Sequence, residues 1–140
     1  ETIQNYHPGV WSQYLELCRK MQASPGVCQY RKTQCCVTSG YRHPQYNTEE
    51  AKGAKDSAHL YGLALDIYVG SDLKEQMRWA KVASSLFTRV AIYPGQTNIH
   101  VDMMPLKDKY AIPFMINIGG TTKERAYSFA ELENKATKYT

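Results

Sequence analysis

The sequence has no cluster of basic residues, although its formal net charge is +4. Its lysines and arginines are scattered along the 140 residues. Proteins that bind nucleic acids usually concentrate such residues on one face or in one run. We therefore expect no nucleic-acid partner. A weakly basic surface suits an anionic polymer of another kind equally well.

Long apolar runs are also missing, and we therefore expect no membrane span. The sequence contains no internal repeat, low-complexity tract or linker. Its composition, 43% hydrophobic and 21% charged, is ordinary for a globular protein and excludes the disordered and fibrous classes. We predict a single domain over residues 1–140, large enough to bury a core, and a monomer.

Cysteine is absent after position 36, and no C-x-x-C pair of the zinc-ribbon or thioredoxin kind occurs. An even, clustered set favours two disulfides that tie an N-terminal helix and loop to the first strand, although four buried thiols would give the same pattern. The sequence does not give their connectivity. Disulfides are typical of an oxidising compartment. The four cysteines are Cys18, Cys28, Cys35 and Cys36.

Hydrophobic spacing predicts an alternation of helices and strands. Two pairs at capping-box spacing, Asp72 with Glu75 and Ser128 with Glu131, mark the starts of the second and third helices. This order indicates an α+β fold with a mostly antiparallel sheet. The expected elements are helices at 9–22, about 73–87 and from Ser128 to about 137, and strands at 35–41, 63–69, 89–93, 98–103 and 110–118.

Two of these strands carry polar residues on the face away from the core. In 63–69 that face holds Asp66, and in 98–103 it holds His100. If the strands share a sheet, the two side chains can converge, and His59 can join them from the preceding loop. Two imidazoles and one carboxylate suit Zn²⁺ and leave a fourth position for water or substrate. Spacing alone favours a simpler interpretation, a solvated histidine and a strand-end aspartate.

Three ordered motifs change this balance: SGYR at 39–42, S-x-H-x-x-G-x-A-x-D at 57–66 and HVD at 100–102, with YP at 93–94 and Asn47. Together they resemble the zinc-dependent D-alanyl-D-alanine carboxypeptidase family. Its relatives include murein endopeptidases, phage endolysins, vancomycin-resistance-type dipeptidases and, more distantly, the hedgehog signalling domain. The resemblance covers about residues 36–103.

The resemblance implies a hedgehog/DD-peptidase-like fold, with helices packed on one side of the sheet. It also implies that His59, Asp66 and His100 bind Zn²⁺ and that Ser57 lines the substrate pocket. Arg42 would hold the substrate's carboxylate or the oxyanion at the scissile carbonyl, a role that suits the fixed fork of donors in a guanidinium. Without the motif, Arg42 would be an ordinary exposed arginine after a turn.

The general base is left open by the sequence. Better-characterised branches of the family place an acid three residues before the last histidine ligand, where this chain has Thr97. Asp102 could be the catalytic base, or it could orient a ligand histidine, a common role of carboxylates at zinc sites. His43, Glu49 and Glu50 are further candidates.

The implied function is zinc-dependent hydrolysis of peptide bonds in peptidoglycan stem peptides or cross-links that contain D-amino acids. The bond that is cut does not follow from the sequence. The alternative is a catalytically impaired, zinc-containing module that binds the cell wall or another ligand. The chain begins at Glu1, so we expect a periplasmic or secreted protein whose signal has been removed, with a phage-borne lysis enzyme as the other setting.

Overall fold

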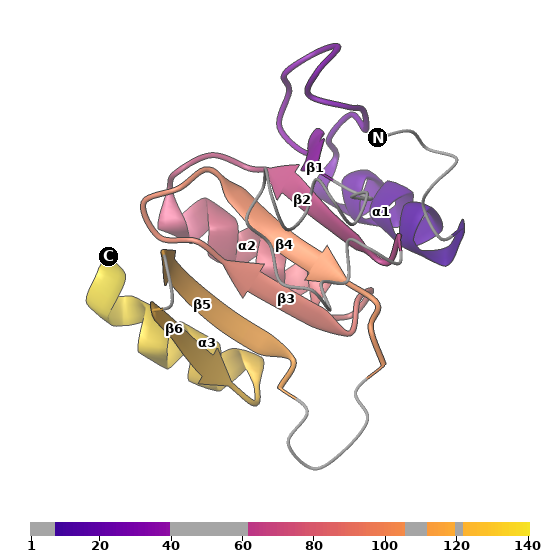
Figure 1. The fold of residues 1–140 in the computed structure, drawn as a ribbon. Coiled ribbons are helices and arrows are strands. Elements are labelled where there is room, and N and C mark those ends of the chain that lie inside the picture. Colours follow the sequence, from indigo (N-terminus) through magenta and orange to yellow (C-terminus); the bar gives the residue numbers. More distant parts are fainter. Residues whose placement is uncertain (1–7, 40–61, 106–111, 120–121) are drawn as a thin grey trace, which may run out of the picture.

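The computed structural model describes residues 8–39, 62–105, 112–119 and 122–140 (Figure 1). The described residues form three α-helices, six strands and a terminal 3₁₀ turn. In chain order these are α1 (Pro8–Met21), β1 (Val37–Ser39), β2 (Ala64–Tyr68), α2 (Leu73–Ala83), β3 (Arg89–Ile92), β4 (Asn98–Asp102), β5 (Phe114–Gly119), β6 (Thr122–Ala126), α3 (Phe129–Ala136) and η4 (Thr137–Tyr139).

The strands form one mixed sheet in the order β1-β2-β4-β3-β5-β6. Four of the five pairings are antiparallel, and β3 and β5 pair in parallel. The predicted α+β class with a mostly antiparallel sheet is therefore confirmed. The expected hairpin of β3 and β4 is present, and it lies in the middle of the sheet. The parallel pair and the edge strand β6 were not predicted.

The helices cover one face of the sheet (Figure 1). Helix α2 packs on β3 and β4, α3 packs on β5 and β6, and α1 contacts α2. The buried core lies between these layers, and burial of each large apolar side chain contributes roughly 1.5–3 kcal/mol. Alternation along the strands leaves the other face for polar side chains. The largest fully buried core residues are Tyr14, Leu17, Leu65, Ile67, Trp79, Ile92, Ile99, Ile116 and Leu132.

The second helix is shorter than its apolar spacing predicts, because it ends at Ala83 rather than near residue 87. The hydroxyls of Ser84 and Ser85 donate to the carbonyls three residues earlier, which favours termination there. At its start, Asp72 accepts from the backbone N–H of Lys74. Glu75 does not complete a capping box with it but pairs with Arg78.

Two disulfides join the N-terminal segments, as predicted. Cys18–Cys35 links α1 to the residues before β1, and Cys28–Cys36 links the intervening loop to the same place. The bridged segment is hydrogen-bonded to the end of β2, since Cys35 N donates to Tyr68 O and Tyr68 N donates to Cys36 O, both at 2.8 Å. No helix in the described ranges is both long and apolar enough to cross a membrane.

A buried glutamine fixes the turn between β3 and β4. The Gln76 side chain on α2 is fully buried. Its Nε2 lies 2.8–3.2 Å from the carbonyl oxygens of Gly70, Tyr93 and Gln96, and its Oε1 accepts from Tyr93 N at 2.9 Å. These bonds satisfy partly buried backbone groups of the turn. They hold the chain that leads into β4 in one position.

Candidate metal centre

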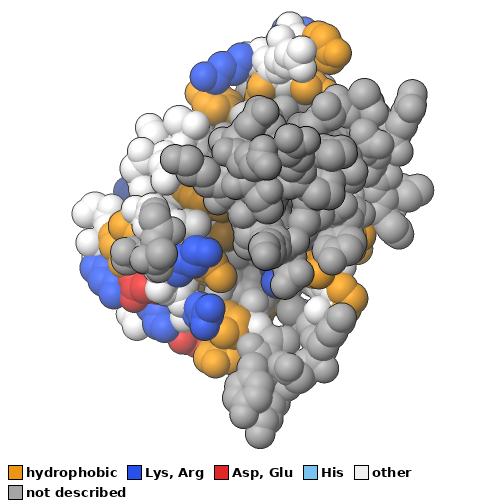
Figure 2. Space-filling model, viewed as in Figure 1, with side chains coloured by type: hydrophobic (Ala, Val, Ile, Leu, Met, Phe, Trp, Pro, Cys, Tyr) orange, Lys and Arg blue, Asp and Glu red, His pale blue; other side chains and the backbone are white. Residues whose placement is uncertain are grey.

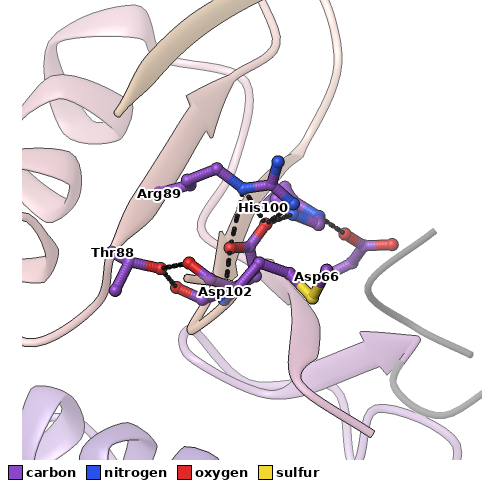
Figure 3. Close-up of polar contacts among 6 residues, drawn as sticks. Asp66, Thr88, Arg89, His100 and Asp102 are labelled. Carbon is purple, nitrogen blue, oxygen red and sulfur yellow. Dashed lines mark hydrogen bonds and ion pairs between the residues drawn. The ribbon is translucent and has the colours of Figure 1, made fainter. Parts of the chain in front are cut away.

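Asp66 and His100 are brought together by the register of β2 and β4. Their Cα atoms are direct partners in this antiparallel pair, and both side chains lie on the face opposite the helices. Asp66 Oδ1 and His100 Nδ1 are 3.1 Å apart (Figure 3). Both side chains are mostly buried, Asp66 at 17% and His100 at 18% exposed. The alternation of both strands therefore produces the convergence that it predicted.

The spacing of these two atoms fits a shared metal ion. Ligand atoms bound at about 2.0–2.1 Å in a tetrahedral zinc site lie about 3.3 Å from one another. The pair would supply two such ligands, Oδ1 of Asp66 and Nδ1 of His100. Among the described residues, no group of three His, Cys, Asp or Glu side chains could hold a metal. The third implied ligand, His59, lies outside the described residues, as do Arg42 and Ser57.

The other ring nitrogen of His100 faces Asp102. Nε2 lies 2.7 Å from Asp102 Oδ2 on the same strand (Figure 3). A carboxylate in this position fixes the tautomer and orientation of a ligand histidine. Asp102 is only 1% exposed, so it is closed off from solvent. Its placement matches the orienting role that carboxylates commonly play behind zinc ligands.

Arg89 completes the network behind His100. It is the Cα partner of Asp102 across β3 and β4, and its Nε lies 2.9 and 3.0 Å from the two carboxylate oxygens. Asp102 Oδ1 also accepts from Met104 N at 3.1 Å. Both oxygens of Asp102 are thus engaged by protein donors. The sequence interpretation missed Arg89, although the alternation of RVAIY already places it on the polar face of β3.

The charges in this network shift two pKa values in opposite directions. Burial by itself lowers the pKa of His100, but Asp102 and Asp66 outweigh it and raise that pKa to about 9. Burial by itself raises the pKa of Asp102, but hydrogen bonds from His100 and Arg89 outweigh it and leave that pKa below its usual value. In the absence of metal, a protonated His100 therefore lies between two carboxylates.

Thr97, three residues before His100, lies exposed in the turn before β4. Its backbone carbonyl accepts from Val69 N and Gly70 N, both at 2.9 Å. The residue thus joins the turn to the end of β2 through its backbone. Its side chain cannot act as a general base.

A cleft opens beside His100 on the same face of the sheet. Its volume is about 190 Å³, and it extends from β4 across β3 to β5 and β6. Figure 2 shows this face hollowed beside a group of Lys and Arg side chains over β5 and β6. Asp102 is the one carboxylate among the described residues that line it. The lining includes Arg89, Ala91, His100, Met115, Asn117 and Lys123.

Comparison with known protein families gives a match over most of the chain. A family model described as Peptidase M15 matches residues 3–102, which is more than half of the chain. Comparison with curated proteins and with solved structures gave no match. The family match includes β2 and β4, the two strands that carry Asp66 and His100, and ends at the last residue of β4. The protein therefore belongs to the peptidase M15 family, a family of metallopeptidases that act on peptidoglycan-related substrates.

Proposed function

We propose that this protein is a zinc-dependent peptidase that hydrolyses peptide bonds in peptidoglycan stem peptides or cross-links. The observation that carries the proposal is the Asp66–His100 pair, two adjacent donors on neighbouring central strands at the spacing of ligands on one metal ion. Family membership supports the class of reaction and of substrate.

His59, Asp66 and His100 would hold the metal in this proposal. When bound, Zn²⁺ would polarise the scissile carbonyl and lower the pKa of a coordinated water. Arg42 would bind a carboxylate of the substrate or the oxyanion at the reacting carbon, and Ser57 would line the pocket. Two of these proposed ligands, Asp66 and His100, lie on neighbouring strands inside the hydrogen-bonded sheet, and the sheet holds their spacing.

Asp102 serves in this proposal as a positioning residue. Its Oδ2 holds a proton on Nε2 of His100, and this tautomer leaves the lone pair of Nδ1 directed toward Asp66. Arg89 and Met104 N occupy the remaining acceptor positions of the carboxylate. A base must reach the attacking water, and Asp102 has both oxygens committed and almost no exposure.

The general base would then come from elsewhere in the chain. His43, Glu49 and Glu50 are the candidates, since they lie between the SGYR motif and the His59 motif.

The two disulfides support an oxidising setting, either the periplasm or the outside of the cell.

One observation favours a second candidate, a zinc-containing module that binds cell-wall peptides without cleaving them. Thr97 stands where the resemblance implies an acid, and Asp102, the carboxylate that follows His100 on β4, is engaged by Arg89 and His100. A chain with no competent base would retain the metal and the cleft but lose turnover.

Digestion of purified murein separates these functions. The zinc-loaded protein, a chelated sample and the chelated sample resupplied with zinc are incubated with murein, and released muropeptides are identified by mass spectrometry. We expect products only with zinc, and their masses name the bond that is cut. His100→Gln should release none. If the zinc-loaded protein binds muropeptides but releases no product, the binding module replaces the peptidase. If it neither binds nor cleaves them, both are wrong.

A further inference from the structure

The cleft beside His100 reaches a part of the chain that the family match does not include. The match ends at residue 102, whereas β5 and β6 form the far wall of the cleft. That wall therefore lies outside the matched range, and it is on the same face of the sheet as the candidate metal centre. A substrate bound at Asp66 and His100 has this cleft next to it.

One row of paired residues connects the two regions. Asp66 pairs with His100, His100 with Ala91, Ala91 with Met115, and Met115 with Arg125. Paired residues in neighbouring strands have their side chains on the same face. The row thus carries the metal-site pair at one end and a cation at the other. The small Ala91 side chain leaves the space that forms the floor of the cleft.

The next position along β5 and β6 carries a second cation. Asn117 pairs with Lys123, two residues further along the same face, and both line the cleft. Lys123 and Arg125 are exposed, and no ion pair joins either side chain to any described residue. Arg89, by contrast, is committed to Asp102. Among the described residues that line the cleft, Lys123 is therefore the cation whose charge is not committed to a described carboxylate.

The distance from the metal-site pair indicates which part of a peptide Lys123 could reach. Strand β6 lies three strand spacings from β4, about 14 Å. The four-carbon stem of a lysine covers part of this span, so an anionic group about 7–10 Å from the scissile bond is within its range. An extended peptide advances about 3.3 Å per residue. This corresponds to a group two to three residues away.

We infer that Lys123, supported by Arg125, binds a free carboxylate of the peptide substrate in this cleft, so that β5 and β6 select anionic stem peptides. The inference rests on the proposed function for the identity of the substrate. The inference gives β5 and β6, which follow the matched range, a role in substrate selection. The proposed metal ligands stay the same.

Two peptides test it on the full-length, zinc-loaded protein: L-Ala–γ-D-Glu–L-Lys–D-Ala–D-Ala, and the same peptide with the free α-carboxylate of D-Glu converted to a carboxamide. Kd is measured by calorimetry, and KM and kcat by product formation. We expect the wild type to bind the carboxylate form about three to ten times more tightly, as for a partly exposed, charge-assisted contact. Lys123→Gln should remove this preference in both Kd and KM, and Lys123→Arg should keep it.

The matched control is Lys81→Gln on α2, an exposed lysine on the helix that covers the opposite face. It should leave the preference unchanged. Equal Kd values of the wild type for the two peptides would overturn the inference, and so would an equal loss for both peptides in Lys123→Gln. If neither peptide is cleaved with zinc bound, cleavage is excluded for these substrates, and the pair of Kd values still decides the carboxylate subsite.

Discussion

Asp66 and His100 are opposed on β2 and β4, with Oδ1 and Nδ1 3.1 Å apart. The backbone register alone sets this relationship, because the two residues are direct partners in an antiparallel pair. Behind His100, Asp102 and Arg89 form two successive layers of support. Asp102 and Arg89 can be replaced separately, and we expect the first change to affect zinc affinity and the second to affect the free energy of unfolding.

Replacing Asp102 by Asn should weaken zinc binding. The amide is a poorer acceptor for Nε2–H of His100, and loss of such a partner typically costs 10–100-fold in metal affinity. We expect a loss of about this size in competition with a chromophoric chelator, and little change in kcat once zinc is saturating. Asp72→Asn, which can still cap α2, is the matched control and should bind zinc normally. An unchanged zinc affinity combined with lost turnover would instead make Asp102 the general base.

Replacing Arg89 by Gln should lower the free energy of unfolding of the metal-free protein by about 1–3 kcal/mol. The substitution removes the cation that holds a nearly fully buried carboxylate, and charged hydrogen bonds of this kind contribute about that amount. Urea denaturation monitored by tryptophan fluorescence measures the change. Arg78→Gln removes an exposed pair with Glu75 on α2 and should cost no more than about 0.5 kcal/mol. Equal effects of the two substitutions would show that Arg89 has no special role.

The stability of the metal-free protein should fall as pH rises above neutrality. The pKa of His100 is about 9 in the folded chain and about 6.5 when unfolded, so its contribution is fully present below pH 6.5 and is lost as pH rises through 9. The pKa difference corresponds to a loss of up to about 3 kcal/mol. Denaturation in chelator between pH 6 and 10 measures it. His100→Gln should remove this part of the slope, and an unchanged slope would contradict the assignment.

Replacing Gln76 by Leu should destabilise the protein by about 2–4 kcal/mol. The leucine leaves partly buried carbonyls of the turn and the N–H of Tyr93 without their partner, and each such group costs up to roughly 1–3 kcal/mol when it stays unsatisfied. The measurement is again denaturant unfolding. Gln96→Ala removes an exposed side chain from the same turn but keeps its backbone carbonyl, so it should cost little. A loss below about 1 kcal/mol in Gln76→Leu would indicate that water replaces the amide.

Much of the central sheet follows from sequence alternation. Strands β2 and β4 present apolar side chains to the core at every second position, and the polar residues between them face the site. Alternation thus placed Asp66 and His100 on the polar faces of their strands, and the convergence followed on the condition that the two strands share a sheet. Arg89 has the same signal in RVAIY, but its partner becomes evident only when the register of β3 and β4 is known.

Other features could not be read from local patterns. Strand β6 reads TKERA, and Ala126 is the one buried residue among positions 123–126, because the strand lies at the edge of the sheet. Its apolar periodicity is correspondingly weak. The parallel pairing of β3 with β5 depends on contacts between segments distant in the sequence. The cleft beside Lys123 depends on strand β6 and on the pairing of β3 with β5, so local sequence patterns did not predict it.

The position of the Asp66–His100 pair in the sheet separates folding from metal uptake. Small zinc domains that lack a core unfold without their metal, because coordination supplies most of their folding free energy. Here two of the implied ligands lie on strands held by backbone pairing and by a buried core of Leu65, Ile99 and Val101. The chain should therefore complete its disulfides and its fold first and acquire the ion afterwards, as a late maturation step that a chelator can reverse without denaturing the protein.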